Sequence, residues 1–367
     1  MRVGLTEAHG MAQEMARFPA DGVRYSFLQP LPERFRMIRS PIKGYFGHYE
    51  ADGVDLIEAV LSPIRTSSRW VYSLATFTEA CAFDLAGAPL PRALRVAYIR
   101  HLMSRPNFKK LIFWSNAGHD TLRSYGGIDP ATLEGKDAVV YPAVRRIADD
   151  LVRFGDGDLR LLFSGDFFRK GGVHVVDAFE RARARYPGIT LIVCCDERID
   201  FNTPNQLLRA EYIHKVNTLP GIVNRGRISR EQLMTEVYPN TDIFLMPTYV
   251  EAFGMALLEA MAFGIPVIST NYFAIPEIIE HGVNGLLIDT ARFDCDRLFS
   301  GYVVREIPAE FRHYMTDAVF AHLCRLIESV DLRKSIGLAA LEAARTRFSF
   351  ERRNAAVLDI YRQAIAN

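Results

Sequence analysis

The stretch EAFGMALLEAMAFGIPV, residues 251–267, predicts a buried helix in a chain of 367 residues. The helix is expected to begin near Phe253 or Gly254 and to run to Gly264, a residue suited to the left-handed conformation that ends many helices. Pro266 prevents the helix from continuing, because proline lacks the amide hydrogen that another turn needs. No Ser, Thr, Asp or Asn stands at the helix start, so its first amides are expected to lack a side-chain cap.

Two carboxylates, Glu251 and Glu259, interrupt this otherwise apolar stretch. Burying an unpaired carboxylate costs several kcal/mol, whereas a carboxylate that accepts hydrogen bonds from sugar hydroxyls is satisfied. Uncapped amides at the positive end of a helix also suit a phosphate. The stretch therefore predicts a sugar-phosphate site. A second interpretation stays open, in which Glu259 pairs with an arginine or a backbone amide elsewhere and Glu251 is solvated.

Short apolar runs alternate with amphipathic stretches on both sides of this helix. The alternation is typical of a parallel sheet covered by helices. In an open parallel sheet, the loops after the carboxyl ends of the strands form the ligand crevice, so residues 251–259 are expected to reach it. Strands are expected within MRVGLTE, VRYSFLQP, DLIEAVLSP, RWVYSLATF, KKLIFWS and DAVVYPAV, and then within LRLLFSG, GITLIVCC, PGIVNRG, DIFLMP, IPVIST and GLLID.

The chain is long enough for two domains of about 150 to 200 residues each. The stretch RRIADDLVRFGDGD, without a Gly/Ser-rich or Pro-rich linker, puts the junction near 140–155 and predicts closely packed domains with a cleft between them. The expected fold class is α/β, with two Rossmann-like domains facing each other across the cleft. The first domain is expected to comprise 1–145 with the final helix 346–367, and the second 146–345.

The tail from Phe350 has the spacing of an amphipathic helix, with apolar residues at Ala355, Leu358, Tyr361 and either Ala364 or Ile365. This segment is expected to form the final helix and to return to the first domain.

Composition and charge argue against several classes of protein. The 44 basic and 43 acidic side chains nearly cancel, which argues against a protein held on nucleic acid by a general basic field. The five cysteines show no metal-ligand spacing and are expected to be reduced thiols in a cytoplasmic protein. No window approaches about 18 uninterrupted apolar residues, so a soluble protein is expected, or one that rests on a membrane surface.

A second stretch with chemical potential is LLFSGDFFRKGGVHVVDAF, residues 161–179. A strand leads into a loop that carries Arg169 and Lys170, and Gly171 and Gly172 open a helix. Arginine offers a planar fork for phosphate oxygens and lysine a mobile point charge, so the two together suit a diphosphate. The alternative is a solvated surface pair, but a place at the carboxyl end of a strand beside glycines favours the site.

A third stretch follows in GIVNRGRISREQLMTEVY. Ser229 and Gln232 predict a capping box at a helix start. The residues before it, Asn224 to Arg227, are expected to form a loop at the same sheet edge, where backbone groups can contact a base.

These stretches, in this order, resemble the carboxyl-terminal domain of the GT-B glycosyltransferases, in particular glycosyltransferase family 4. The E-x7-E signature of that family matches Glu251 and Glu259 within the frame E-x-F-G-x-x-x-x-E-A-M-A-x-G-x-P-V, and the resemblance covers about residues 138–289. It implies the GT-B fold and a retaining enzyme of glycan or glycoconjugate synthesis that needs no metal or other cofactor. The implied reaction moves a hexosyl unit from a nucleotide diphosphate sugar to a hydroxyl of a carbohydrate or glycolipid-type acceptor.

By position, the resemblance implies that Glu251 holds hydroxyls of the donor sugar and that Glu259 holds the nucleotide ribose. Arg169 and Lys170 match the basic pair on the diphosphate, and they would stabilise the charge of the departing phosphates. The incoming hydroxyl would give its proton to a leaving phosphate oxygen. The amides implied at the sugar and the distal phosphate, and the residue implied near the ribose, are those of Phe253, Gly254 and Met255, and Leu258.

Three features depart from the family's pattern, and the first is that the glycine pair that commonly follows the first strand appears only as EAHGM. Gly165 is followed by Asp166, where the family has G-R-x, so Arg169 is expected to substitute for the missing basic residue. The stretch SLATFTEACAF lacks a histidine that the family often has there. The candidate acceptor-side residues are His9, His48, Glu79 and His119, each with a structural role as the alternative.

Other functions fit parts of the pattern. Metal-dependent sugar transfer uses a D-x-D pair, and Asp156 with Asp158 or Asp294 with Asp296 has that spacing, although the first pair resembles a turn and the second lies in an irregular segment. An epimerase of GT-B fold would need a dedicated acid and base, which the sequence does not place. A non-catalytic module that binds sugar nucleotides is a further alternative.

The stretch PRALRVAYIRHLMSRPNFKK, residues 91–110, is basic and contains no acid. Its apolar residues are interleaved with arginines and lysines, which predicts an amphipathic helix able to rest on anionic lipid. The alternative is a core helix with a solvated basic face.

Overall fold

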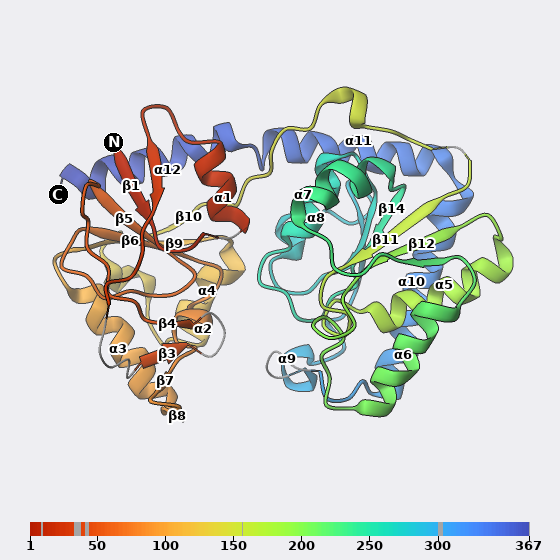
Figure 1. The fold of residues 1–367 in the computed structure, drawn as a ribbon, viewed down its shortest axis with the longest axis horizontal. Helices are drawn as coiled ribbons and strands as arrows, with labels where there is room; N and C mark the ends of the chain where they lie inside the picture. Colours follow the sequence, from red (N-terminus) through yellow and green to blue (C-terminus); the bar gives the residue numbers. More distant parts are fainter. Residues whose placement is uncertain (9, 33–37, 41–43, 156, 300–303, 367) are drawn as a thin grey trace. The chain divides into compact units, whose positions relative to one another are not determined.

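The computed structural model describes the chain except residues 9, 33–37, 41–43, 156, 300–303 and 367 (Figure 1). The described residues form two compact units, one of Met1–Arg145 with Phe348–Asn367 and the other of Arg146–Arg347. Among the described residues, no helix combines the length and the apolarity that crossing a bilayer requires.

The first unit is built on a six-stranded sheet in the order β10-β9-β6-β5-β1-β2, and every pair of neighbouring strands is parallel. The central strands β5 and β6 are buried along their whole length, as expected where helices cover both faces of a parallel sheet. The strands are β1 (Arg2–Leu5), β2 (Arg24–Phe27), β5 (Leu56–Val60), β6 (Trp70–Leu74), β9 (Phe108–Phe113) and β10 (Asp137–Val139).

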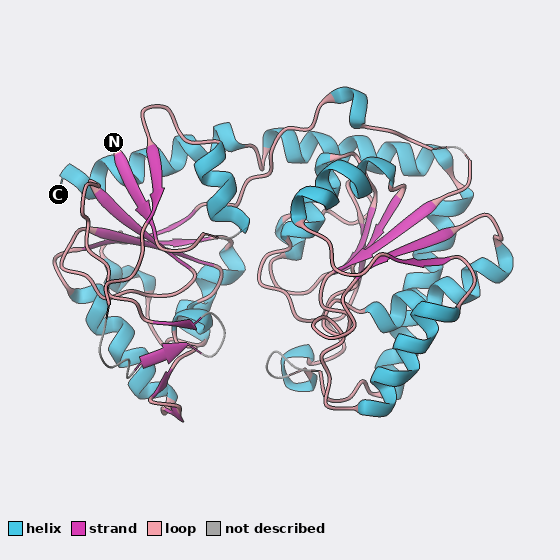
Figure 2. Cartoon of the chain, viewed as in Figure 1, coloured by secondary structure: helices cyan, strands magenta, loops and turns pink. Residues whose placement is uncertain are grey.

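Helices lie on both faces of this sheet (Figure 2). Successive strand residues point to opposite faces, so Trp70 and Tyr72 join one core while Val71, between them, joins the other. Helices α1 and α12 lie on one face, and α2, α3 and α4 on the other (Figure 1). Their bounds are α1 (Gly10–Arg17), α2 (Phe77–Ala80), α3 (Arg92–Ser104), α4 (Asn116–Ser124) and α12 (Phe350–Ala366).

The first unit also contains a small antiparallel sheet that the sequence did not predict. Its order is β4-β3-β7-β8, with β3 at Ile38–Ser40, β4 at Gly44–Tyr45, β7 at Asp84–Leu85 and β8 at Ala88–Pro89. Strands this short carry no usable alternation of apolar and polar residues, which explains why the pattern missed them.

The second unit has its own six-stranded sheet in the order β13-β12-β11-β14-β15-β16, again parallel throughout. All strands predicted for the two parallel sheets are therefore confirmed. The strands are β11 (Arg160–Ser164), β12 (Thr190–Cys194), β13 (Ile222–Asn224), β14 (Ile243–Leu245), β15 (Val267–Thr270) and β16 (Leu286–Ile288).

The helices of the second unit also lie on both faces of its sheet. Figure 1 shows α5, α6 and α10 on one face and α7, α8 and α11 on the other, and α10 packs against α5 while α11 packs against α8. The bounds are α5 (Gly172–Arg185), α6 (Gln206–Thr218), α7 (Arg230–Gln232), α8 (Met255–Ala262), α9 (Cys295–Leu298), α10 (Ala309–Glu328) and α11 (Val330–Thr346).

The direction of the chain across the second sheet changes between β11 and β14. From β11 the chain moves outward through β12 to β13, and it then returns to the other side of β11 as β14 before moving on to β15 and β16. Because parallel crossovers are right-handed, this reversal puts α5 and α8 on opposite faces. The loops that follow β11 and β14 therefore lead to helices on opposite faces, and the carboxyl edge at this reversal is where open α/β sheets bind ligands.

The final helix is confirmed, but its predicted apolar face is partly wrong. Ala355 is exposed and Leu358 is only half-buried. The buried positions of α12 are Phe350, Arg353, Val357, Ile360, Tyr361 and Ala364. The spacing of apolar residues could not show this face fully, because it includes Arg353, a charged residue that is expected to be exposed.

Candidate active site

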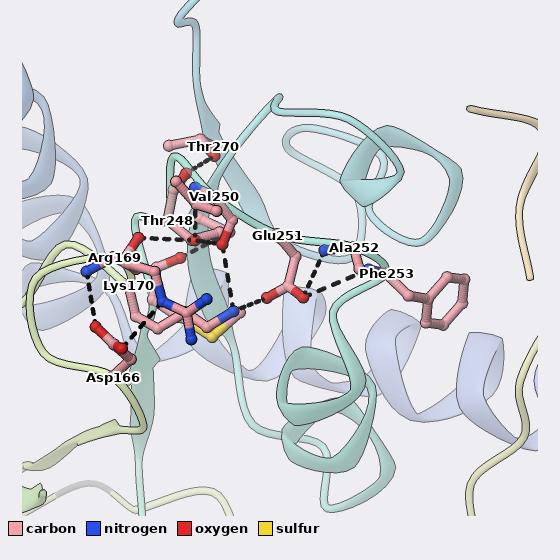
Figure 3. Close-up of polar contacts among 11 residues, drawn as sticks. Asp166, Arg169, Lys170, Thr248, Val250, Glu251, Ala252, Phe253 and Thr270 are labelled. Atoms are coloured by element: carbon pink, nitrogen blue, oxygen red, sulfur yellow. Dashed lines mark hydrogen bonds and ion pairs between the residues drawn. The ribbon is translucent and has the colours of Figure 1, made fainter. Parts of the chain in front are cut away.

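The loops after β11 and β14 meet at the point where the strand order reverses (Figure 3). The Thr248 hydroxyl donates to the Arg169 carbonyl at 3.1 Å, and the Tyr249 amide donates to the same oxygen at 3.3 Å. Gly171 has φ +80°, and a Cβ there would lie 2.3 Å from the carbonyl oxygen of Pro247. The close approach of the two loops therefore requires glycine at the start of α5.

Lys170 and Glu251 form an ion pair between these two loops. Their side chains are 18% and 12% exposed, so the pair is sheltered from solvent but not sealed. Burial alone would raise the pKa of Glu251, but the charge of Lys170, its hydrogen bond and the amides of Ala252 and Phe253 lower that pKa below its usual value. The carboxylate is therefore ionised at neutral pH, and Glu251 is not a solvated loop acid.

Helix α8 begins as the sequence predicted, without a side-chain cap. Gly254 is the N-cap with φ +113°, and the helix ends before Gly264, whose φ is +71°. One detail differs from the prediction. The Phe253 amide, which was expected to face the crevice, donates to the Glu251 carboxylate at 3.4 Å, and the Ala252 amide does so at 2.9 Å.

Arg169 forms an ion pair with Asp166. Asp166 stands at the position where the family that the sequence resembles has an arginine. The Arg169 Nε donates to one carboxylate oxygen at 3.0 Å, and the Arg169 backbone amide donates to the other at 3.2 Å. The Arg169 side chain is 24% exposed, so the alternative of a fully solvated Arg-Lys pair is wrong. Asp166 both shapes the loop and neutralises part of the charge that Arg169 would offer to a diphosphate.

Glu259 lies on the second turn of α8 and is buried. Its carboxylate accepts from Arg230 Nε at 2.5 Å and from the Tyr238 hydroxyl at 3.4 Å. The possibility that an arginine meets Glu259 is thus realised in the structure. Leu258, predicted near a ribose, is fully buried in the core beside it.

The capping box is confirmed, since the Ser229 hydroxyl accepts from the Gln232 amide and the Gln232 side chain accepts from the Ser229 amide. The sequence did not single out Arg230, Tyr238 or Thr248, although each contacts a predicted site residue or its loop. For Arg230 the capping box was an available signal, because it fixes where the following helix starts. For Tyr238 and Thr248 no comparable signal exists in the sequence.

The acceptor-side candidates do not gather around one carboxylate. His119 Nε2 lies 2.6 Å from Asp137, and His48 Nε2 lies 2.9 Å from Glu50. Glu79 lies on the short helix α2, where its amide donates to the Thr76 hydroxyl at 3.0 Å. His9 lies outside the described residues.

The D-x-D pattern at Asp294 and Asp296 has local partners. Asp294 caps α9 by accepting from the Arg297 amide at 3.0 Å, and Asp296 accepts from the Tyr272 hydroxyl at 2.7 Å. The other pattern includes Asp156, which the structure does not describe. In the described part of the chain, no group of three or more His, Cys, Asp and Glu side chains is placed to hold a metal ion.

Solved structures share this architecture. A glycosyltransferase from Rickettsia africae matches all of the chain over 90% of its own length, with a TM-score of 0.62 and 17% identity. HepE from Anabaena, solved in complex with UDP and glucose, matches 98% of the chain over 98% of its length, with a TM-score of 0.62 and 14% identity. The fold is therefore that of the GT-B glycosyltransferases, as the resemblance implied.

Sequence comparisons match the second unit to a known family. Residues 148–295 match the family model of glycosyl transferases group 1. A D-inositol 3-phosphate glycosyltransferase from Paenarthrobacter aurescens is 26% identical over 267 residues, which span 70% of this chain and 58% of that protein. An N-acetyl-alpha-D-glucosaminyl L-malate synthase from Bacillus anthracis is 39% identical over 62 residues. The chain thus spans at most 58% of the length of these two relatives.

Proposed function

We propose that the protein is a glycosyltransferase that moves a hexosyl unit from a nucleotide diphosphate sugar to an acceptor hydroxyl, in glycan or glycoconjugate synthesis. The observation that carries this proposal is the Lys170–Glu251 ion pair at the strand-order reversal, beside the uncapped start of α8. The pair puts a cation and a hydroxyl-binding carboxylate next to a helix end that favours phosphate. The match of residues 148–295 to the group 1 family model supports the same conclusion.

Each group has a distinct task in this proposal. Glu251 accepts hydrogen bonds from hydroxyls of the donor sugar, and Lys170 with Arg169 neutralises the diphosphate as it departs. The amides at Gly254 and Met255 add the positive end of the helix. In a low-dielectric site such preorganised groups contribute about 3–4 kcal/mol each to stabilisation of the transition state.

We propose further that the configuration at the anomeric carbon is retained and that no metal is needed. The bond from that carbon to the diphosphate breaks, the bond to the acceptor oxygen forms on the same face, and the acceptor proton passes to a phosphate oxygen. NMR of the first product tests the configuration, and inversion contradicts the proposal. Activity after exhaustive treatment with a chelator tests the metal, and loss that is restored by a divalent cation contradicts metal independence.

The donor is best sought first among UDP-sugars, because a structural neighbour of similar architecture was solved with UDP and glucose. A thermal-shift screen with UDP-, GDP- and ADP-sugars identifies the base, since a ligand that binds only the folded state raises the unfolding temperature. No shift with any of these donors would contradict a nucleotide-sugar site.

A non-catalytic module and an epimerase of the same fold make different predictions. A transferase releases the nucleoside diphosphate in proportion to glycosylated acceptor. A binding module releases none, and an epimerase converts the donor without any acceptor. Chromatography of the nucleotides and sugars after incubation with and without acceptor therefore separates the three functions.

We also propose that α3 of the first unit rests on anionic lipid. Its apolar face packs in the core of the first unit, as expected for the alternative of a core helix with a basic face, so the proposed lipid contact depends on the basic side. Arg92, Arg100 and Arg105 are exposed and form no ion pair with an acid among the described residues. Leu94 is 57% exposed on the same helix. Other residues of α3, among them Arg92 and Arg100, line a groove of about 700 Å³ together with Tyr125. An acid-free helix with an exposed apolar side chain suits a negatively charged membrane surface.

Liposome flotation with and without anionic lipid tests this surface. Charge reversal at Arg100 and Arg105 is expected to abolish flotation with anionic vesicles, whereas reversal at the exposed Lys334 of α11 serves as the matched control. Equal flotation with neutral and anionic vesicles, or none with either, contradicts a membrane contact at α3.

A further inference from the structure

One irregular segment supplies both groups that hold Glu259. Arg230 begins α7, directly after the Ser229 capping box, and Tyr238 follows a turn of π-helix at Leu233–Val237. Both side chains turn toward the same carboxylate on α8, at 2.5 Å for Arg230 Nε and 3.4 Å for the Tyr238 hydroxyl. Turns of π-helix are rare and frequently occur at functional sites.

The segment is anchored on its inner side. Met234, Val237 and Tyr238 are buried, and the Tyr238 ring stacks on Phe263 at the end of α8, with 5.5 Å between the ring centroids. The capping box fixes the other end of the segment, so Arg230 is presented from a rigid helix start rather than from a mobile loop. This anchoring lets a long side chain hold one position.

The two members of the pair differ in exposure. The Glu259 side chain is 7% exposed and that of Arg230 is 27% exposed, so the arginine side chain as a whole is the more exposed partner. A carboxylate offers about four acceptor positions and a guanidinium five donors. One hydrogen bond from Arg230 Nε uses one of these acceptor positions and fixes the carboxylate, through which Arg230 can act on a ligand.

We propose that Arg230 is a positioning residue for the nucleotide ribose, through its ion pair with Glu259. The ligand class is a ribonucleotide, because the two acceptor oxygens of a fixed carboxylate match a vicinal diol, in which each hydroxyl can donate one hydrogen bond. Arg230 orients the carboxylate toward the diol and limits the positions it can take. This inference rests on the proposed nucleotide-sugar site and concerns how that site distinguishes ribose from deoxyribose.

The test compares the affinity for UDP with that for 2′-deoxy-UDP by calorimetry. Wild-type protein is expected to prefer UDP by about ten-fold or more, the factor given by one net hydrogen bond. Arg230→Gln is expected to reduce this preference to about two-fold. Arg230→Lys should retain part of it, because lysine keeps the charge but loses the fixed direction of the guanidinium donors. If wild-type protein does not bind UDP, the GDP and ADP pairs with their 2′-deoxy forms replace it.

A matched control is Arg181→Gln, which removes an exposed ion pair with Asp317 in the same unit. It should leave the preference for ribose unchanged. Tyr238→Phe removes the weaker partner of Glu259 and is expected to change the preference less than Arg230→Gln does. Circular dichroism checks that each variant is folded. If Arg230→Gln does not fold, the preference for UDP over 2′-deoxy-UDP is compared between Arg230→Lys and Tyr238→Phe, and the larger loss is expected in Arg230→Lys.

Two kinds of failure are distinguishable. If the wild-type protein binds UDP and the Arg230 variants keep its full preference for ribose, the inference is overturned while the nucleotide site stands. If the wild-type protein binds none of the ribonucleotides, the proposed function is overturned and the inference with it. If only stability changes in the variants, Arg230 is a structural partner of Glu259 and does not position a ligand group.

Discussion

Lys170 and Glu251, which are 81 residues apart in the chain, form an ion pair that joins the loop after β11 to the loop after β14. In the described structure, each of the two charges is paired with the other. A diphosphate sugar in the proposed site would bind beside this ion pair without breaking it. Glu251 keeps a fixed orientation because two backbone amides also donate to it. The pair therefore links the architecture of the sheet to the proposed chemistry.

Alanine at Lys170 or at Glu251 is expected to lower turnover by about 100- to 1,000-fold, since each removes a preorganised charge from the transition state. The fold should persist, as judged by circular dichroism. Lys334→Ala, at an exposed position of α11, is the matched control and should keep wild-type turnover. Wild-type turnover in both site variants would refute the roles given to them.

Asp166 is expected to weaken donor binding, because its charge partly neutralises Arg169. Asp166→Asn keeps an oxygen for the Arg169 amide but removes the negative charge, so the donor KM should fall about three- to ten-fold. Asp166→Ala removes the loop contact as well and should give a higher donor KM than the asparagine variant does. A donor KM that is equal or higher in Asp166→Asn than in wild type contradicts this account.

Gly254→Ala is expected to destabilise the second unit by about 1–3 kcal/mol, since φ +113° is a conformation that residues with a Cβ rarely adopt. A Cβ there would also lie 3.2 Å from Leu257 and 3.3 Å from Ile278. Thermal unfolding measures the loss. Gly157→Ala is the control, because that glycine has no heavy atom within 4 Å of an added Cβ and an ordinary φ.

Stability should also depend on pH through His174. This residue is fully buried on α5, and its desolvation lowers its pKa from 6.5 to about 3, with Asp177 opposing and Arg312 reinforcing the shift. Between these values the unfolded chain binds a proton that the folded chain does not. The free energy of unfolding therefore rises with pH in this range, and it falls by about 1.4 kcal/mol for each pH unit below about 6.

Urea unfolding followed by far-UV circular dichroism at several pH values between about 4 and 7 measures this slope. His174→Gln should flatten it, while His313→Gln, at an exposed position of α10, should leave it unchanged. An equally steep slope in His174→Gln would show that other groups cause the acid sensitivity.

Much of the fold followed from patterns within short windows. The parallel strands, the bounds of α8 and the capping box at Ser229 depend on local periodicity and on residues suited to helix ends, which the sequence displays directly. The small antiparallel sheet was missed because β3 pairs with β7, more than 40 residues away, through only two residue pairs. Such strands form because tertiary contacts place them, not because of local preference.

The candidate site was likewise predicted only in part from the sequence. The sequence singled out Glu251, Glu259 and the Arg169–Lys170 pair from their positions at strand and helix ends, but it did not indicate which residues would pair with them. Asp166 meets Arg169 within one loop, whereas Arg230 meets Glu259 from 29 residues away. A pairing between distant loops depends on how the sheet brings them together, and no spacing within the sequence records it.

The buried arginine of the final helix, Arg353, is another residue whose partners the sequence did not indicate, and it allows a last prediction. Arg353 lies near Tyr25, Glu58 and Tyr361, and burial, which would lower its pKa, is outweighed by the charges around it. Glu58 is fully buried in β5 and accepts from the Ser73 hydroxyl at 2.5 Å and from the Tyr361 hydroxyl. This network ties α12 to the sheet of the first unit.

Glu58→Gln and Arg353→Met are each expected to destabilise the first unit by about 3–5 kcal/mol, because each leaves a buried charge without its counterpart. The double variant should lose less than the sum of the two single losses, because it leaves neither charge behind. Tryptophan fluorescence during urea unfolding measures this unit alone, since both tryptophans, Trp70 and Trp114, lie within it. Additive losses would show that Arg353 and Glu58 stabilise α12 independently of each other.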